Sequence, residues 1–404
     1  MSENNNTKSN AGGALAGALC ALGVSCDCVD FDSTPNTIIY HFNLHNIKDL
    51  PKVKKATALL SAVLHEQVTF SESDKAHFAL IFARQDREII PFTNAYYTAD
   101  LKPLDALIGI DSTGRAVKIS VDDMVSALCV GTSGSGKSTF LHSFICSLCC
   151  STRAEKLGFV LIDCKRSELM RYNEKCAHLM CNVVTEPQDA LTRLNQVIDI
   201  MKNRYATMEA RKINTCPADF SRIVIIVDEL AELMLSTNKR IAQGTKTALI
   251  RLCQLGRACG IHCVLCTQSP RVAVIDGLIQ TNTPTKFALR TSSSRESVIA
   301  IGHGGCESLF GRGDMIYKPA DDIKERRLQV PYISASDIEK IFANLPTRER
   351  QAQPTKTEKP KKSYKERLFE VYKRIQARQA REHERSAGIT LQDCIDFDTM
   401  DDDE

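Results

Sequence analysis

The sequence predicts an α/β fold with a mainly parallel sheet, preceded by a smaller α/β domain and flanked by tails that are disordered or helical. Two observations predict it. Short apolar runs alternate with helical patterns between Leu107 and Tyr317, which is typical of strands and helices wound into a parallel sheet. A glycine-rich loop also stands between one apolar run and a helical stretch. The predicted strands are Ala127 to Val130, Phe159 to Asp163, Ile223 to Asp228, Cys263 to Thr267, Lys286 to Leu289 and Met315 to Tyr317.

Changes of composition divide the chain into four segments. Residues 1–35 begin with a polar Asn/Ser run and are expected to form a disordered leader. Residues 36–105 combine two strand patterns with one helical pattern and predict a small α/β domain, and residues 106–345 hold the alternating pattern of the larger domain. Residues 346–404 are expected to form a linker, a basic amphipathic helix and an acidic tail. This end is interpreted either as a solvated helix with a solubilising tail, or as a basic helix that touches DNA or a neighbouring subunit.

Composition predicts a globular cytoplasmic protein. The chain has 404 residues, 43% of them apolar, and a formal net charge of +3 that does not by itself indicate a partner. Its 17 cysteines are scattered through apolar segments with no secretory signal before them, which indicates a reducing compartment. Cys146-x-x-Cys149 on a predicted helix and Cys263-x-x-Cys266 in a predicted strand are not expected to form zinc sites. No segment is apolar enough to span a membrane, so membrane association would require an anchored partner.

The octapeptide from Gly131 to Ser138 fits the phosphate-loop pattern G-x-x-x-x-G-K-[ST] at every fixed position. Its glycines allow backbone N–H groups to surround phosphates, Lys137 can bridge the outer phosphates, and the Ser138 hydroxyl can bind magnesium. The loop therefore predicts a nucleotide site with Mg²⁺. The residues expected to contact the nucleotide are Gly131, Thr132, Ser133, Gly134, Ser135, Gly136, Lys137, Ser138 and Thr139.

Two further strand ends supply groups for hydrolysis. The apolar strand from Arg222 ends in Asp228 and Glu229, which are expected to serve the metal and to activate the attacking water, respectively. The next strand ends in Thr267 and Gln268, where a neutral amide could contact the γ-phosphate or the water. Ligands bind at this carboxyl edge in open α/β sheets. Lys137, Glu229 and Gln268 are therefore the predicted catalytic residues, and Ser138 and Asp228 the predicted metal residues.

These motifs lie within a longer stretch of sequence that resembles the FtsK/SpoIIIE family of DNA translocases, whose motor has a RecA-like P-loop NTPase core. The resemblance extends from Thr37 to Asp337, and the leading domain resembles the family's alpha domain. It implies an ATP-driven, ring-shaped hexamer that threads double-stranded DNA, in DNA transfer, conjugation or chromosome partition. The matching segments are Phe159 to Leu169, Gly256 to His262, Thr267 to Pro270, Asn282 to Thr285 and Gly304 to Met315.

The resemblance also implies residues that act between subunits and on DNA. Family members complete each site with an arginine from a neighbouring subunit; this sequence has Lys286 at the expected position, with Arg290 and Arg295 nearby as alternatives. Cys164 replaces the proline of the family's Asp-Pro-Lys turn. The family's membrane-spanning helices and its winged-helix domain, which reads DNA orientation, are not recognised in this sequence. Contact is therefore expected to be mainly with the phosphate backbone of DNA. The candidate contacts are Lys239, Arg240, Lys246 and Arg271.

Two other functions remain open at this stage. The same fold serves as a motor for protein export, although export motors usually string several such domains together. The third hypothesis is a module that binds ATP without hydrolysing it and recruits partners through its charged tail. The complete set of Lys137, Ser138, Asp228 and Glu229 argues against this hypothesis.

Overall fold

The computed structural model describes residues 2–33, 37–66, 68–71, 76–84, 89–321 and 324–346. The linker, basic helix and acidic tail predicted over 346–404 lie outside this range from residue 347 onward. In the described part, no helix combines the length and the apolar character that crossing a membrane requires.

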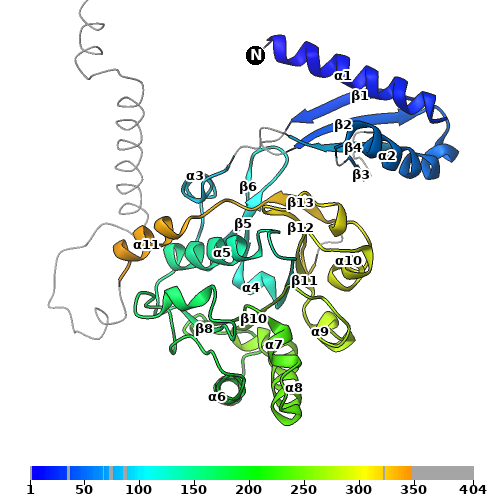
Figure 1. The fold of residues 1–404 in the computed structure, drawn as a ribbon. Coiled ribbons are helices and arrows are strands. Elements are labelled where there is room, and N and C mark those ends of the chain that lie inside the picture. Colours follow the sequence, from blue (N-terminus) through cyan, green and yellow to red (C-terminus); the bar gives the residue numbers. More distant parts are fainter. Residues whose placement is uncertain are drawn as a thin grey trace, which may run out of the picture.

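The N-terminal domain is a four-stranded antiparallel sheet in the order β1-β2-β4-β3 (Figure 1). Its strands are β1 (Cys26–Ser33), β2 (Thr37–Leu44), β3 (Val68–Ser71) and β4 (Phe78–Ala83). Its helices are α1 (Ser2–Ala21), the short η1 (Ile47–Asp49) and α2 (Leu50–Leu64). The rings of Phe42 and Phe78 stack across β2 and β4 with centroids 5.1 Å apart in its core.

The expectation of a disordered leader over residues 1–35 is wrong. Helix α1 covers much of this segment, and β1 pairs in antiparallel register with β2. Leu19 and Val24 are fully buried in the same core as Phe42. The polar Asn/Ser run predicts disorder by itself. The apolar residues that follow it become ordered because β2 and α2, later in the chain, supply their packing partners.

The larger domain contains a nine-stranded sheet in the order β6-β5-β13-β12-β11-β7-β10-β9-β8. The five strands from β11 to β8 in this order run parallel, which confirms the predicted α/β core with its parallel sheet. Antiparallel strands extend it beyond β11. The bounds are β5 (Asp105–Ile110), β6 (Ala116–Ser120), β7 (Ala127–Val130), β8 (Leu157–Ile162), β9 (Arg222–Val227), β10 (Ile261–Thr267), β11 (Thr285–Leu289), β12 (Asp314–Lys318) and β13 (Arg326–Gln329).

Helices cover both faces of this sheet and enclose two apolar cores (Figure 1). One core lies under α3 (Phe92–Thr98), α5 (Lys137–Ser151) and α11 (Ala335–Asn344). The other lies under α6 (Pro187–Ala210), α8 (Lys239–Leu255) and α10 (Ser294–Ile301). The shorter helices are α4 (Val121–Met124), η2 (Leu169–Tyr172), α7 (Leu230–Met234), η3 (Arg257–Cys259), α9 (Gly277–Asn282) and η4 (Cys306–Ser308).

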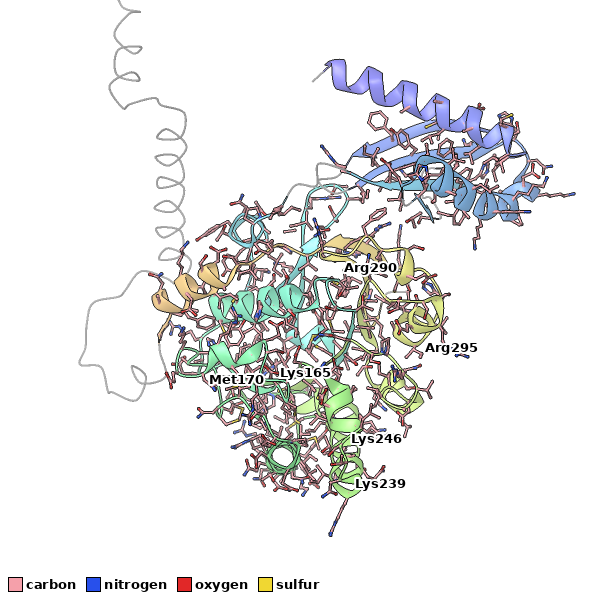
Figure 2. The ribbon with its side chains drawn as sticks, in the orientation of Figure 1. Lys165, Met170, Lys239, Lys246, Arg290 and Arg295 are labelled. Atoms are coloured by element: carbon pink, nitrogen blue, oxygen red, sulfur yellow. The ribbon has the colours of Figure 1, made fainter. Side chains whose placement is uncertain are left out.

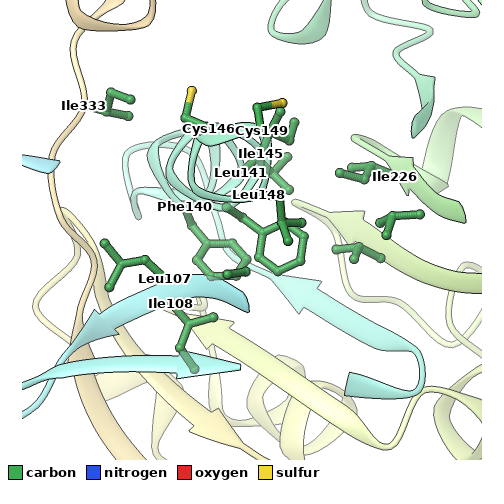
Figure 3. Packing of buried hydrophobic residues seen from close by; sticks show 14 of the residues in the cluster. Leu107, Ile108, Phe140, Leu141, Ile145, Cys146, Leu148, Cys149, Ile226 and Ile333 are labelled. Carbon is green, nitrogen blue, oxygen red and sulfur yellow. The ribbon is translucent and has the colours of Figure 1, made fainter. Parts of the chain in front are cut away.

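The helix that follows the glycine-rich loop is buried along most of its length. Phe140 and Leu148 of α5 point toward the strands, and Phe140 lies 4.7 Å from Phe287 of β11 between ring centroids (Figure 3). This apolar contact fixes the start of α5 against the centre of the sheet.

The predicted boundary at residue 105 falls too late. Phe92 and Ala95 of α3 are buried in the core of the larger domain, and Phe92 N donates to the carbonyl of Tyr332 at 2.8 Å. The larger domain therefore includes α3, because the apolar face of this short helix packs on the large sheet.

Candidate nucleotide-binding site

The glycine-rich loop has the backbone geometry that phosphate binding needs. Gly134 and Gly136 adopt positive φ values of 73° and 103°, a region that residues with a Cβ disfavour. A Cβ at Gly136 would stand 2.4 Å from the backbone nitrogen of Gly313. The loop is therefore closely covered by Gly313, whose N–H donates to the carbonyl of Ser135 at 2.7 Å.

The lysine of the loop is bound to the aspartate at the end of β9. Lys137 Nζ donates to Asp228 Oδ1 at 2.6 Å and to the Asp228 carbonyl at 2.8 Å. The two side chains are only 3% and 2% exposed. Burial disfavours the charged ammonium, but the adjacent Asp228 carboxylate outweighs it, so the pKa of Lys137 is raised. Lys137 is therefore ionised and retains one N–H for a ligand.

The neighbouring Glu229 side chain accepts hydrogen bonds from four donors, one of which is the backbone N–H of Ala231 at 3.4 Å from Oε1. Thr267 Oγ1 donates to Oε1 at 2.6 Å, and Lys165 Nζ donates to Oε2 at 3.0 Å. The backbone N–H of Gln268 donates to Oε2 at 3.2 Å. Burial opposes ionisation of this carboxyl, but these hydrogen bonds outweigh burial and lower the pKa of Glu229. The structure thus places Glu229 beside Gln268, as their strand ends predict, with Glu229 in its carboxylate form.

A second carboxylate reaches the loop from the segment after β8. Ser138 Oγ donates to Glu168 Oε1 at 2.8 Å, and His142 Nε2 lies 3.2 Å from Glu168 Oε2. The hydrogen bond from His142 is the main cause of a lowered pKa at Glu168. Asp163 fixes this turn by accepting from the backbone N–H of Glu168 at 3.0 Å.

Sequence reasoning assigned no role to Glu168 or Lys165. Both lie in the turn after Ile162, the last residue of β8, and β8 pairs with β9 in parallel register. A signal was present, because the carboxyl ends of parallel neighbours share an edge and the turn after β8 must therefore face Asp228 and Glu229.

The residues present fit a nucleoside triphosphate with a divalent cation. The Ser135 hydroxyl is buried and, within the described part of the chain, has no hydrogen-bond partner. A buried orphan donor in the centre of the loop is suited to a phosphate oxygen. The Ser138 hydroxyl and the carboxylates of Asp228 and Glu168 are oxygen donors, which Mg²⁺ prefers.

Comparison with known proteins identifies the family. The family described as FtsK/SpoIIIE matches residues 92–222 and 217–272. This chain carries an FtsK/SpoIIIE-family domain. Proteins named DNA translocase FtsK are 37% identical over 272 residues in Streptococcus pyogenes serotype M3, covering 62% of this chain and 33% of the relative. The protein of the same name in Mycobacterium tuberculosis is 32% identical over 338 residues, which cover 76% of this chain and 40% of that relative. The chain thus spans a third to two fifths of the length of these relatives.

Two solved structures have a similar fold. The conjugation coupling protein TcpA of pCW3, in its monomer form with ATPgS, has a TM-score of 0.58 at 20% identity, covering 79% of this chain and 93% of that protein. The cytoplasmic domain of the Type VII secretion ATPase EccC of Thermomonospora curvata has a TM-score of 0.54 at 19% identity, covering 66% and 36%.

The three candidates for a residue acting between subunits have different environments in the larger domain. Lys286 Nζ donates to the carbonyl of Gln280 at 2.9 Å and to Thr283 Oγ1 at 3.1 Å, and burial together with Lys318 lowers the pKa of Lys286 to about 8. Its ammonium is thus engaged inside its own chain, which does not fit the role. Arg290 and Arg295 are both exposed (Figure 2). The backbone carbonyl of Arg290 accepts from Thr132 N at 3.0 Å, so this residue adjoins its own loop.

The four candidate DNA contacts also differ. Lys239 and Arg240 are exposed at the first turn of α8, and Arg271 is exposed after β10. Lys246, further along α8, forms an ion pair with Asp276 at 2.5 Å and is only partly exposed (Figure 2). Its charge is already partly neutralised, so Lys246 is the weakest of the four candidates.

Proposed function

We propose that this chain hydrolyses ATP with Mg²⁺ and uses the energy to move along double-stranded DNA, as a ring-shaped oligomer in which neighbouring subunits complete each other's sites. The observation that carries the proposal is the buried ion pair between Lys137 of the phosphate loop and Asp228, with the buried Glu229 directly after Asp228 in the chain. These are the groups that bind phosphates, position a metal and activate water in P-loop ATPases.

Each residue has a distinct role in the proposed reaction. The loop N–H groups and Lys137 would hold the phosphates, and Ser138 and Asp228 would hold Mg²⁺, with Glu168 as a further carboxylate beside Ser138. The bound Mg²⁺ neutralises charge on the phosphates. Glu229, ionised at neutral pH, accepts the proton of the attacking water, and Gln268 orients that water.

The choice of DNA as the substrate is supported by the relatives. The two proteins named DNA translocase are 37% and 32% identical to this chain over the aligned residues, whereas the secretion ATPase shares the fold at 19% identity. Exposed basic residues at the start of α8 and after β10 suit contact with a phosphate backbone. A peptide motor is therefore the second candidate, and it predicts stimulation by a peptide instead.

The test measures ATP hydrolysis by the full chain with and without linear duplex DNA, with Lys137→Ala as the control. Displacement of a short third strand from a DNA triplex measures movement in the same sample. We expect DNA to stimulate hydrolysis, and Lys137→Ala to abolish hydrolysis and displacement together. Hydrolysis that does not respond to duplex DNA would remove DNA translocation as the function. Hydrolysis that persists in Lys137→Ala would show that the phosphate loop is not the site of ATP hydrolysis.

A further inference from the structure

A second cluster of reactive side chains lies buried away from the nucleotide site. Cys149, Cys176 and His178 each offer one ligand atom, and these three atoms lie within 4.8 Å of one another. Their exposed fractions are 0%, 1% and 7%. Thiol and imidazole groups gathered in an apolar interior are the donor set that thiophilic metals select.

Two distant parts of the chain build this cluster. Cys149 projects from α5 on the side opposite to Phe140, away from the strands (Figure 3). Cys176 and His178 lie in a turn closed by Leu179 N, which donates to the carbonyl of Cys176 at 3.2 Å. The carbonyl of His178 accepts from Phe159 N at 2.7 Å, so the turn is fixed to β8.

The distance between the two sulfur atoms fits a shared metal ion. Sγ of Cys149 lies 3.7 Å from Sγ of Cys176. Two thiolates bound to tetrahedral zinc at about 2.3 Å each stand about 3.8 Å apart. A disulfide would need the sulfur atoms to approach to about 2.05 Å. The backbone thus holds the sulfurs at the separation found on zinc.

The histidine is oriented as a ligand. His178 Nε2 lies 2.9 Å from the carbonyl of Thr152. A carbonyl oxygen only accepts hydrogen bonds, so Nε2 carries the hydrogen and Nδ1 keeps its lone pair. Histidines that bind metals in proteins generally donate their other ring N–H in this way, which fixes both the tautomer and the ring plane.

We propose that Cys149, Cys176 and His178 bind one Zn²⁺ ion. The ion ties the C-terminal end of α5 to the turn that follows η2. Helix α5 begins at Lys137, and η2 begins directly after Glu168. The metal therefore fixes the two elements that carry the Ser138 and Glu168 partners, at the end remote from the phosphates. The site is structural and rests on its own geometry, so it stands or falls independently of DNA translocation.

The test measures zinc by mass spectrometry in the full chain, purified with a phosphine reductant. We expect about one zinc ion per chain, as a structural site requires. Cys176→Ser should lower the zinc content to background, and His178→Ala should weaken zinc binding by more than about tenfold. Cys150→Ser is the matched control, because Cys150 is buried one residue from Cys149 but is not part of the cluster, and it should keep the full zinc content.

X-ray absorption at the zinc edge of the unmodified chain tests the site without any substitution that endangers folding. Two sulfur neighbours and one imidazole nitrogen are expected. Folded, reduced protein that holds no zinc after incubation with Zn²⁺ would overturn the proposal. Equal zinc contents in Cys176→Ser and the unmodified chain, or an absorption spectrum without sulfur neighbours, would overturn it as well.

Discussion

Lys137 Nζ lies 2.6 Å from Asp228 Oδ1, and both side chains are almost wholly buried. Breaking a buried ion pair leaves an uncompensated charge in a medium of low dielectric, which costs about 3 to 5 kcal/mol. The pair therefore contributes to the stability of the folded domain as well as to nucleotide binding.

Lys137→Ala is expected to lose nucleotide binding and to lower the free energy of unfolding by about 3 to 5 kcal/mol. Denaturant titration and a fluorescent nucleotide measure the two effects. The double variant Lys137→Met with Asp228→Asn removes both charges and should recover much of the stability while remaining unable to bind. Equal stability losses in the single and double variants would show that the pair is not coupled.

Glu229→Gln is expected to bind ATP but to hydrolyse it about 10² to 10⁴ times more slowly, because the amide cannot accept the proton of water. Glu232→Gln is the matched control, since Glu232 lies 4.0 Å from the same Lys165 and is half-exposed. Single-turnover hydrolysis with pre-bound ATP measures the step. A fall of similar size in both variants would point to loss of Lys165 contacts instead of loss of the base.

Glu168→Gln is expected to raise the Mg²⁺ concentration needed for half-maximal hydrolysis, because it removes a carboxylate charge beside Ser138. Glu186→Gln serves as the control, since Glu186 forms an exposed ion pair with Arg166, two residues before Glu168 in the chain. Magnesium titrations at saturating ATP measure the shift. An unchanged magnesium requirement would limit Glu168 to a structural role.

The lowered pKa of Lys286 predicts a dependence of stability on pH. The folded state releases this proton near pH 8, whereas the unfolded chain keeps it to about pH 10.4. Between these values the unfolded state binds more protons, so the stability contributed by Lys286 rises with pH, by about 1 to 3 kcal/mol in total. Lys286→Met should be more stable near neutral pH and should lack this rise. Denaturant titrations at several pH values compare the two chains.

Arg295→Ala is expected to bind ATP normally but to slow hydrolysis by about 10³-fold, as loss of an arginine that acts across subunits does. Mixing it with Lys137→Ala subunits should restore part of the activity, because some neighbouring pairs then combine an intact loop with an intact arginine. Arg290→Ala, mixed in the same way, tests the alternative. The arginine whose variant shows no recovery on mixing acts within its own subunit.

Lys239→Ala and Arg240→Ala are expected to weaken DNA binding and to lower the slope of log affinity against log salt by about one unit each. Lys246→Ala, whose charge is paired with Asp276, should change the slope less. Binding to duplex DNA at several salt concentrations gives the slopes. If the slope of log affinity against log salt is the same for all variants and the unmodified chain, DNA binds elsewhere on the domain.

The phosphate loop and the Asp228–Glu229 pair could be predicted from the sequence because each is a contiguous motif next to an apolar strand. Backbone glycines and strand ends act locally, and parallel strands bring their carboxyl ends to one edge whatever the rest of the chain does. The α/β fold and the family could be predicted for the same reason, and both predictions are confirmed.

The tertiary structure alone decided which side chains face one another. Glu168 reaches Ser138, and Lys165 reaches Glu229, across 30 and 64 residues of sequence. Packing also partly buried Lys286 within its own chain, and it ordered the segment around Leu19, although a polar Asn/Ser run precedes that segment. Burial and long-range contact arise from how the layers close on each other, so no local pattern carries them.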